Sequence, residues 1–128
     1  MLNPIVERRL NIAFGLLKEV EVNVQYEFWN SCVNRLYYAC FHAVRALLTA
    51  KDVNDVKTHA GVWSMFNLHI VRPGLIPHDQ AAFYSTLMDC RSEADYDDFQ
   101  EFSREEVESF MEGTRVFLQQ IKDLVESL

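Results

Sequence analysis

The strongest constraint on the fold is one long amphipathic run, from about Glu27 to Ala50, that contains neither glycine nor proline. A run of this length is far longer than a β-strand and predicts a helix. The whole chain has only four glycines and three prolines, which favours long helices over a turn-rich β architecture. At about 100° per residue, one apolar face of this helix collects Trp29, Val33, Leu36, Cys40, Val44 and Leu47.

Four further helices are predicted around this run, and no segment alternates polar and apolar residues as a strand does. Short connections between long helices indicate antiparallel neighbours. We therefore expect an all-α, antiparallel bundle of four to five helices. The other helices are expected from about Pro4 to Val22 after an Asn3 cap, from about Thr58 to Val71, from an Asp79 cap to about Tyr96, and from a Ser103–Glu106 capping box onward.

Length and composition indicate one soluble domain over residues 1–128. No apolar run is long enough for a membrane span, and charges near the N-terminus argue against a signal peptide. The three cysteines form no CxxC pair, so a reducing, cytoplasmic setting is expected. The formal net charge of −7 excludes non-specific coating of nucleic acid. Any contact with RNA must therefore come from a local basic pocket.

The helix over 27–50 carries a second unusual face, opposite its apolar stripe. Two small residues, Ala39 and Ala46, lie there among polar and charged residues, and small residues allow another surface to approach closely. We therefore expect a homodimer that uses this face. The polar members of the face are Arg35, Tyr38, His42 and Arg45.

Candidate site residues also lie on other helices. Arg91 and Asp95 are four residues apart, which suits an ion pair on one helix face. This pair is either an ordinary intrahelical contact or part of a polar cluster with Arg35, Tyr38, His42 and Tyr96. His42 and His59 are single helix-mounted histidines without a local ligand set, so hydrogen-bonded bundle residues are the preferred interpretation. No metal site and no cofactor are predicted.

Three segments together resemble one family. They are NRLYYACFHAVRALL over residues 34–48, KTHAGVWSMF over 57–66 and RSEADYDDF over 91–99. The chain is similar to HEPN domains, and to a small prokaryotic branch with YYAxFHAxRALL, THxG and RxxADY motifs. The resemblance implies a helical bundle, commonly a homodimer, and frequent pairing with a minimal nucleotidyltransferase in a toxin–antitoxin-like module.

Many HEPN proteins are metal-independent ribonucleases, and their motif is an arginine followed after four to six residues by a histidine. This sequence departs from that motif, because Asp95 and Tyr96 stand near where the ribonuclease branch has histidine and tyrosine. A carboxylate repels an RNA phosphate and is a poor acid at neutral pH. The Arg35–His42 and Arg72–His78 spacings lie outside the motif's place and do not replace it.

Three functional hypotheses follow. The first is a binding or regulatory module that dimerises through the face with Tyr38, His42 and Arg45 and engages a nucleotidyltransferase or a nucleotide-like ligand. The second is a ribonuclease toxin that acts on RNA through Arg91 with His42 or Asp95. The third is a purely structural dimer. No membrane association is expected.

Overall fold

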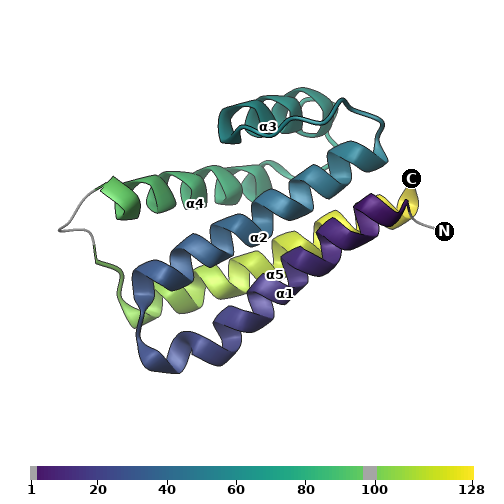
Figure 1. The fold of residues 1–128 in the computed structure, drawn as a ribbon. Helices are drawn as coiled ribbons and strands as arrows, with labels where there is room; N and C mark the ends of the chain where they lie inside the picture. Colours follow the sequence, from purple (N-terminus) through teal and green to yellow (C-terminus); the bar gives the residue numbers. More distant parts are fainter. Residues whose placement is uncertain (1–2, 97–100) are drawn as a thin grey trace.

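The computed structural model describes residues 3–96 and 101–128, with side chains described up to residue 91 and again from residue 101. The described chain folds into α-helices without a β-strand, which confirms the predicted fold class. Figure 1 shows their arrangement. The elements are α1 (Pro4–Asn23), η1 (Val24–Tyr26), α2 (Trp29–Ala50), α3 (His59–Phe66), η2 (Asn67–Val71), α4 (His78–Tyr96) and α5 (Arg104–Ser127).

Most helix starts follow the capping residues in the sequence. The side chain of Asn3 accepts a hydrogen bond from the backbone N–H of Ile5 at the start of α1. Ser103 and Glu106 form the complete predicted capping box at the start of α5. At α3 the hydroxyl of Thr58 accepts a 3.0 Å hydrogen bond from the backbone N–H of Gly61. These caps satisfy backbone donors that the first turn of a helix leaves unpaired.

Two helix starts differ in detail from the prediction. The second helix was expected from about Glu27, but α2 begins at Trp29 because Glu27 has a left-handed backbone (φ 63°) that ends η1. Asp79 was expected to cap the fourth helix. Instead the backbone N–H groups of Gln80 and Ala81 donate to the carbonyl of Pro77, so Asp79 lies inside the first turn of α4.

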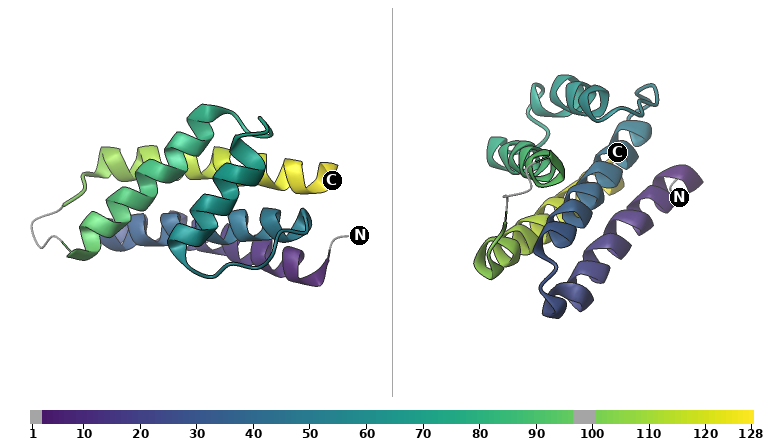
Figure 2. Two further views of the ribbon diagram at one scale, coloured as in Figure 1. Left: turned by 90° about the horizontal axis from the view of Figure 1, so that it is seen from above. Right: turned by 60° about the vertical axis from the view of Figure 1, so that its left-hand side comes forward.

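Helix α2 is the central element, and it packs against α1, α3, α4 and α5. Figure 1 shows α1 and α2 running in opposite directions, as do α4 and α5, which agrees with the predicted antiparallel arrangement. The two views of Figure 2 show α1 on one side of α2 and the layer of α3 and α4 on the other. The two sides of α2 are therefore both covered within one chain.

The two sides of α2 are built from different residues. Ala39, Ala43 and Ala46 are fully buried on the side that faces α1. On the other side Tyr37 and Phe41 are buried toward α3 and α4, where Tyr37 stacks on Tyr84 with ring centroids 6.1 Å apart. The aromatic packing continues into the core through Phe66 and Phe117, each 6.2 Å or less from the next ring.

The interpretation of the small-residue face as a contact surface for a partner was wrong for its alanines. Arg35 of α2 pairs with Glu19 of α1, and Thr49 of α2 accepts a hydrogen bond from Arg9 of α1. Ala39 and Ala46 lie on the same face of α2, between these two contacts. Their small side chains let α1 approach α2 closely within the chain, so they do not argue for a dimer.

Candidate functional site

A polar and aromatic cluster forms where α2, α3 and α4 meet. Helix α2 contributes Tyr37 and Tyr38, α3 contributes His59 as its first residue, and α4 contributes Arg91. Three of these residues, Tyr38, His59 and Arg91, were predicted as site residues from the sequence. We call these four residues the arginine–tyrosine cluster. Each of them is carried by a helix, so the fold of the bundle fixes their relative positions.

Arg91 is held against the two tyrosines of α2. One of its terminal nitrogens donates a 2.9 Å hydrogen bond to the hydroxyl of Tyr38. The guanidinium carbon lies 5.4 Å from the ring centroid of Tyr38 and 5.6 Å from that of Tyr37, within the range of cation–π attraction. These contacts orient a planar cationic group that suits phosphate recognition.

His59 is tied to the same cluster through Tyr37. The hydroxyl oxygen of Tyr37 lies 2.6 Å from Nδ1 of His59. Burial, and secondarily the charge of Arg91, lowers the pKa of His59, which favours the neutral imidazole. Burial raises the pKa of Tyr37 to about 12, so its hydroxyl keeps its proton at neutral pH. A protonated Tyr37 can donate to Nδ1, and Nε2 then carries the ring N–H of His59.

A second polar group lies on α2 beyond the ring of Phe41. Phe41 packs against His59 with centroids 4.8 Å apart and against His42 at 5.8 Å, so it stands between the two histidines. The guanidinium of Arg45 lies 5.8 Å from the same ring. His42 was expected in one cluster with Tyr38 and Arg91, but its described ring contact is with Phe41. Arg45, predicted on the same face of α2, contacts Asp55.

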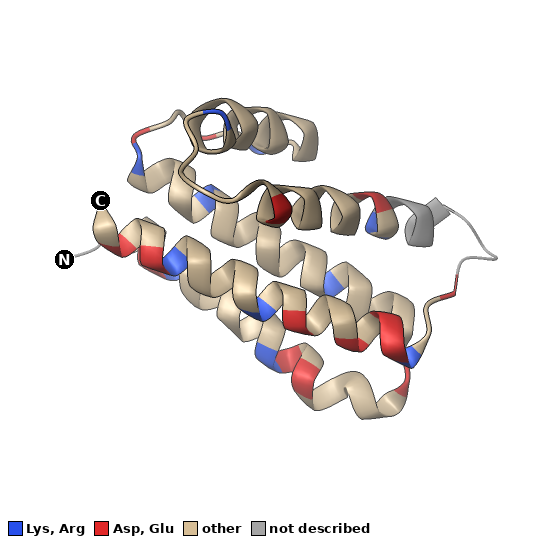
Figure 3. Ribbon diagram, turned by 180° about the vertical axis from the view of Figure 1, so that it is seen from behind, with Lys and Arg blue, Asp and Glu red and all other residues tan. Residues whose placement is uncertain are grey.

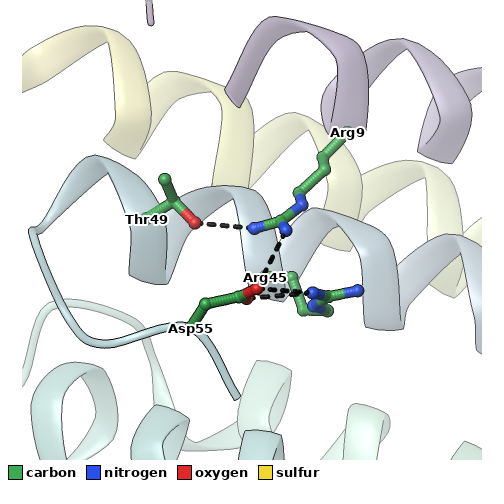
Figure 4. Close-up of polar contacts among 4 residues, drawn as sticks. All are labelled: Arg9, Arg45, Thr49 and Asp55. Atoms are coloured by element: carbon green, nitrogen blue, oxygen red, sulfur yellow. Dashed lines mark hydrogen bonds and ion pairs between the residues drawn. The ribbon is translucent and has the colours of Figure 1, made fainter. Parts of the chain in front are cut away.

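This second group joins two arginines to one carboxylate (Figure 4). A terminal nitrogen of Arg45 donates to both carboxylate oxygens of Asp55, at 2.9 and 3.2 Å. Arg9 of α1 donates to the same carboxylate at 3.4 Å and to the hydroxyl of Thr49 at 2.7 Å. The hydrogen bond from Arg45 is the main cause that lowers the pKa of Asp55. We call Arg9, Arg45, Thr49 and Asp55 the arginine clamp.

The remaining predicted site residues do not join either group in the described structure. Arg35 forms a surface ion pair with Glu19 at 2.8 Å, with both side chains 43% exposed. Such a pair contributes little to stability. The backbone of Asp95 and Tyr96 belongs to the last turn of α4, but their side chains lie outside the described residues. The expected Arg91–Asp95 pair therefore stays a prediction.

Sequence reasoning missed Tyr37, Arg9 and Asp55. Tyr37 precedes the predicted Tyr38, and the pair of tyrosines was the available signal, because successive residues on a helix point about 100° apart and can serve two neighbouring helices. Asp55 lies in the short connection between α2 and α3, outside every helix that the sequence predicts. Arg9 meets Asp55 across 46 residues of sequence, and no local pattern contains such a contact.

The described residues set limits on other kinds of site. No group of three or more His, Cys, Asp or Glu side chains comes together among them. No helix in this part of the chain is long and apolar enough to cross a membrane. A surface hollow lined by residues including Leu75, Val116 and Leu124 lies over α5, outside both polar groups.

Comparison with known proteins identifies the family. The HEPN domain profile matches residues 6–124, which is nearly the whole chain. The chain belongs to the HEPN domain family. A Thermotoga maritima "UPF0332 protein" is 35% identical over 124 residues, 97% of this chain and 93% of the relative.

Two further relatives of this chain come from Methanocaldococcus jannaschii. "Putative toxin MJ0142" is 32% identical and covers 91% of this chain and 79% of its own length. "Putative toxin MJ0605" is 30% identical and covers 96% of this chain and 90% of its own length. These matches confirm the HEPN resemblance that the sequence motifs indicated.

Proposed function

We propose that this HEPN protein is a binding or regulatory module that holds a phosphate-bearing, nucleotide-like ligand at the arginine–tyrosine cluster. The observation that carries the proposal is the placement of Arg91 against Tyr38 and Tyr37, with His59 tied to the same tyrosines. A guanidinium binds phosphate oxygens through several N–H groups at once. The half-buried ring of Tyr38 can stack on a base, and the ring N–H of neutral His59 supplies a further donor.

The distribution of charge agrees with a local site. Acidic residues gather along α1 and α5 (Figure 3), whereas the arginine–tyrosine cluster lies between α2, α3 and α4. The chain as a whole carries a net charge of −7, so an anionic ligand gains little attraction at long range. Binding must therefore depend on short contacts at the cluster, and we expect a modest dependence of affinity on salt.

The proposal includes a homodimer and a minimal nucleotidyltransferase partner. Tyr38, His42 and Arg45 are half-buried and lie on one side of α2, next to both polar groups, which suits a dimer interface at the rim of the site. The word toxin in the names of two relatives supports a toxin–antitoxin-like module, and the proposal places this module in the cytoplasm. Sedimentation velocity at micromolar concentration should show a dimer, and a monomer would remove this part of the proposal.

A second candidate function is an RNA-cleaving toxin, favoured by one specific observation. His59 of α3 and Arg91 of α4 contact the same two tyrosines of α2, Tyr37 and Tyr38, so an arginine and a histidine share one cluster without the Arg-to-His spacing of the family motif. In metal-independent cleavage the ribose 2′-oxygen loses its proton to a base and attacks phosphorus. The 5′-oxygen then leaves and takes up a proton from an acid. His59 could exchange one of these protons while Arg91 holds the phosphate.

Calorimetry with nucleoside monophosphates, nucleoside triphosphates and a short single-stranded RNA tests the proposal. Arg91→Gln should weaken binding about 10- to 100-fold, because a charge-assisted contact contributes roughly 1.5–3 kcal/mol. Arg8→Gln, an exposed residue of α1, serves as the charge-matched control and should bind as the wild type does.

The outcomes separate the candidate functions. Equal binding by the Arg91→Gln variant and the wild type would contradict the ligand-site proposal. Cleavage of the RNA by the wild type, lost in both Arg91→Gln and His59→Gln, would select the ribonuclease. A dimer that binds no probe and cleaves no RNA would leave the purely structural role.

A further inference from the structure

The arginine clamp has more positive charge than its own carboxylate neutralises. Two guanidinium groups, Arg9 and Arg45, share the single carboxylate of Asp55. Both arginine side chains are only 16% exposed, whereas the side chain of Asp55 is 44% exposed. The carboxylate is therefore the more exposed partner of two largely buried guanidinium groups (Figure 4). The described contacts leave a surplus of one positive charge there, in a chain whose net charge is strongly negative.

The arginine clamp also contains a buried hydrogen-bond donor that no described residue satisfies. The Nε of Arg45 is buried and has no hydrogen-bond partner among the described residues, while a terminal nitrogen of the same group binds Asp55. A buried donor without a partner is destabilising. The edge formed by Nε and a terminal nitrogen is the edge with which arginine binds a tetrahedral anion through two parallel hydrogen bonds.

A third observation concerns His42, which lies on the same helix as Arg45. The pKa of His42 is lowered by burial and by the charges of Arg45 and Arg9, so its ring lies within electrostatic reach of both arginines. Thr49 adds a hydroxyl that already accepts a hydrogen bond from Arg9. Helices α1 and α2 thus supply the two guanidinium groups and the hydroxyl of the arginine clamp, and α2 also carries His42.

Asp55 is the one member of the arginine clamp that no helix carries. It lies in the connection between α2 and α3, and within the described chain no backbone hydrogen bond joins residues 54–57 to a helix. Replacing its carboxylate requires movement of this short connection and leaves the helices in place. The arginines, in contrast, are carried by helices and stay where they are.

We propose that Arg9 and Arg45 form a binding site for a phosphate-type dianion, and that the carboxylate of Asp55 occupies this site in the absence of the ligand. A dianion neutralises both guanidinium groups, whereas Asp55 neutralises one. Its tetrahedral oxygens can also use the Nε of Arg45. This site is separate from the arginine–tyrosine cluster, because its residues come from α1, α2 and the α2–α3 connection, whereas the cluster joins α2, α3 and α4.

The test compares Asp55→Asn with the double variant Asp55→Asn/Arg45→Gln, in inorganic phosphate and in sodium chloride of equal ionic strength. Asp55→Asn removes the internal competitor and keeps the shape. Phosphate should raise the melting temperature of this variant, because a ligand that binds only the folded state stabilises it. The double variant should show no phosphate-specific rise. An equal response of the two variants to phosphate would overturn the proposal.

A second readout uses the wild type, so the test does not depend on how well the variants fold. Phosphate binding next to His42 should raise the pKa of this histidine, measured by NMR, in the wild type and more strongly in Asp55→Asn. The same shift should persist in Arg91→Gln and vanish in Arg45→Gln. If phosphate left the pKa of His42 unchanged in the wild type and in Asp55→Asn, the clamp would be only structural.

The source of the dianion is separated by adding a nucleoside monophosphate in a parallel titration. Tighter binding than inorganic phosphate assigns the site to the phosphate of a nucleotide, and equal binding assigns it to free phosphate. Because Arg91→Gln removes only the arginine–tyrosine cluster, failure of this site and failure of the proposed function give different results.

Discussion

The two sides of α2 differ in what they bury and in what they carry. Toward α1 the helix presents Ala39, Ala43 and Ala46, which bring two backbones close together. Toward α3 and α4 it presents Tyr37 and Phe41, and this side leads to Arg91 and His59. The alanine side fixes the scaffold, while the aromatic side supplies rings and hydroxyls that orient charged groups. The arginine–tyrosine cluster therefore lies on the aromatic side, whereas the arginine clamp joins Arg9 of α1 to Arg45 and Thr49 of α2 through side chains at the edge of the α1 contact.

The largest expected effect comes from overfilling the alanine side. Ala46→Leu should lower the free energy of unfolding by about 1–3 kcal/mol, because a buried side chain there must push α1 away. The same substitution at the exposed Ala82 of α4 should change it by less than about 0.5 kcal/mol. Urea denaturation measures both. If Ala46→Leu left the stability unchanged and altered oligomerisation, the alanine side would instead contact a partner chain.

A smaller effect is expected where the α2–α3 connection meets the aromatic side. A Cβ added at Gly61 would lie 2.3 Å from Cγ1 of Val56 and 2.7 Å from the capping hydroxyl of Thr58. Gly61→Ala should therefore destabilise the protein by about 1 kcal/mol, the usual cost of a lost cap. Gly15→Ala in α1 meets no atom within 4 Å and should stabilise by roughly 0.5–1 kcal/mol. Thermal denaturation that shows the same sign for both would refute the contact.

On the aromatic side, removal of one hydroxyl tests the bond to His59. Tyr37→Phe should cost about 0.5–1.5 kcal/mol, because it deletes a short hydrogen bond and leaves Nδ1 of His59 without that partner. Tyr26→Phe, at a tyrosine that is 60% exposed, should be nearly neutral. Chemical denaturation of the two variants side by side is sufficient. Equal stabilities would mean that the Tyr37–His59 bond contributes nothing.

The smallest expected effect is a dependence of stability on pH. The folded state lowers the pKa of His59 and of His42, so the unfolded chain binds protons more readily as pH falls below about 6.5. The stability these neutral histidines contribute is present above that pH and declines on acidification. His59→Gln should make the loss between about pH 7 and pH 5 less steep. A steeper loss of stability in His59→Gln than in the wild type would contradict a lowered pKa of His59 in the folded state.

The sequence predicted what depends on local pattern. Helix periodicity, the Asn3 cap and the Ser103–Glu106 box depend on neighbours a few residues apart, and the structure has them. Asp79 misled because Pro77 lies two residues earlier and its carbonyl already starts the helix. The alanines of α2 misled because a small-residue face looks the same whether its neighbour is in the same chain or in another.

The candidate site was predicted only in part for a related reason. Tyr38, His59 and Arg91 were named from the sequence and lie in one cluster, but His42 was also expected beside Tyr38 and Arg91, whereas its described ring contact is with Phe41. A helical projection gives the direction of a side chain from its own axis and leaves the neighbouring helix unspecified. Contacts such as that of Arg9 with Asp55 depend on the tertiary fold alone.

The most direct test of the proposed ligand site is an NMR titration of the wild type with a nucleoside monophosphate, observing the ring signals of His59. The exposed His78 serves as the internal reference. We predict a saturable shift of the His59 signals that disappears in Arg91→Gln while the His78 signals stay constant. A His59 that does not respond, or that responds equally without the Arg91 guanidinium, would contradict the account.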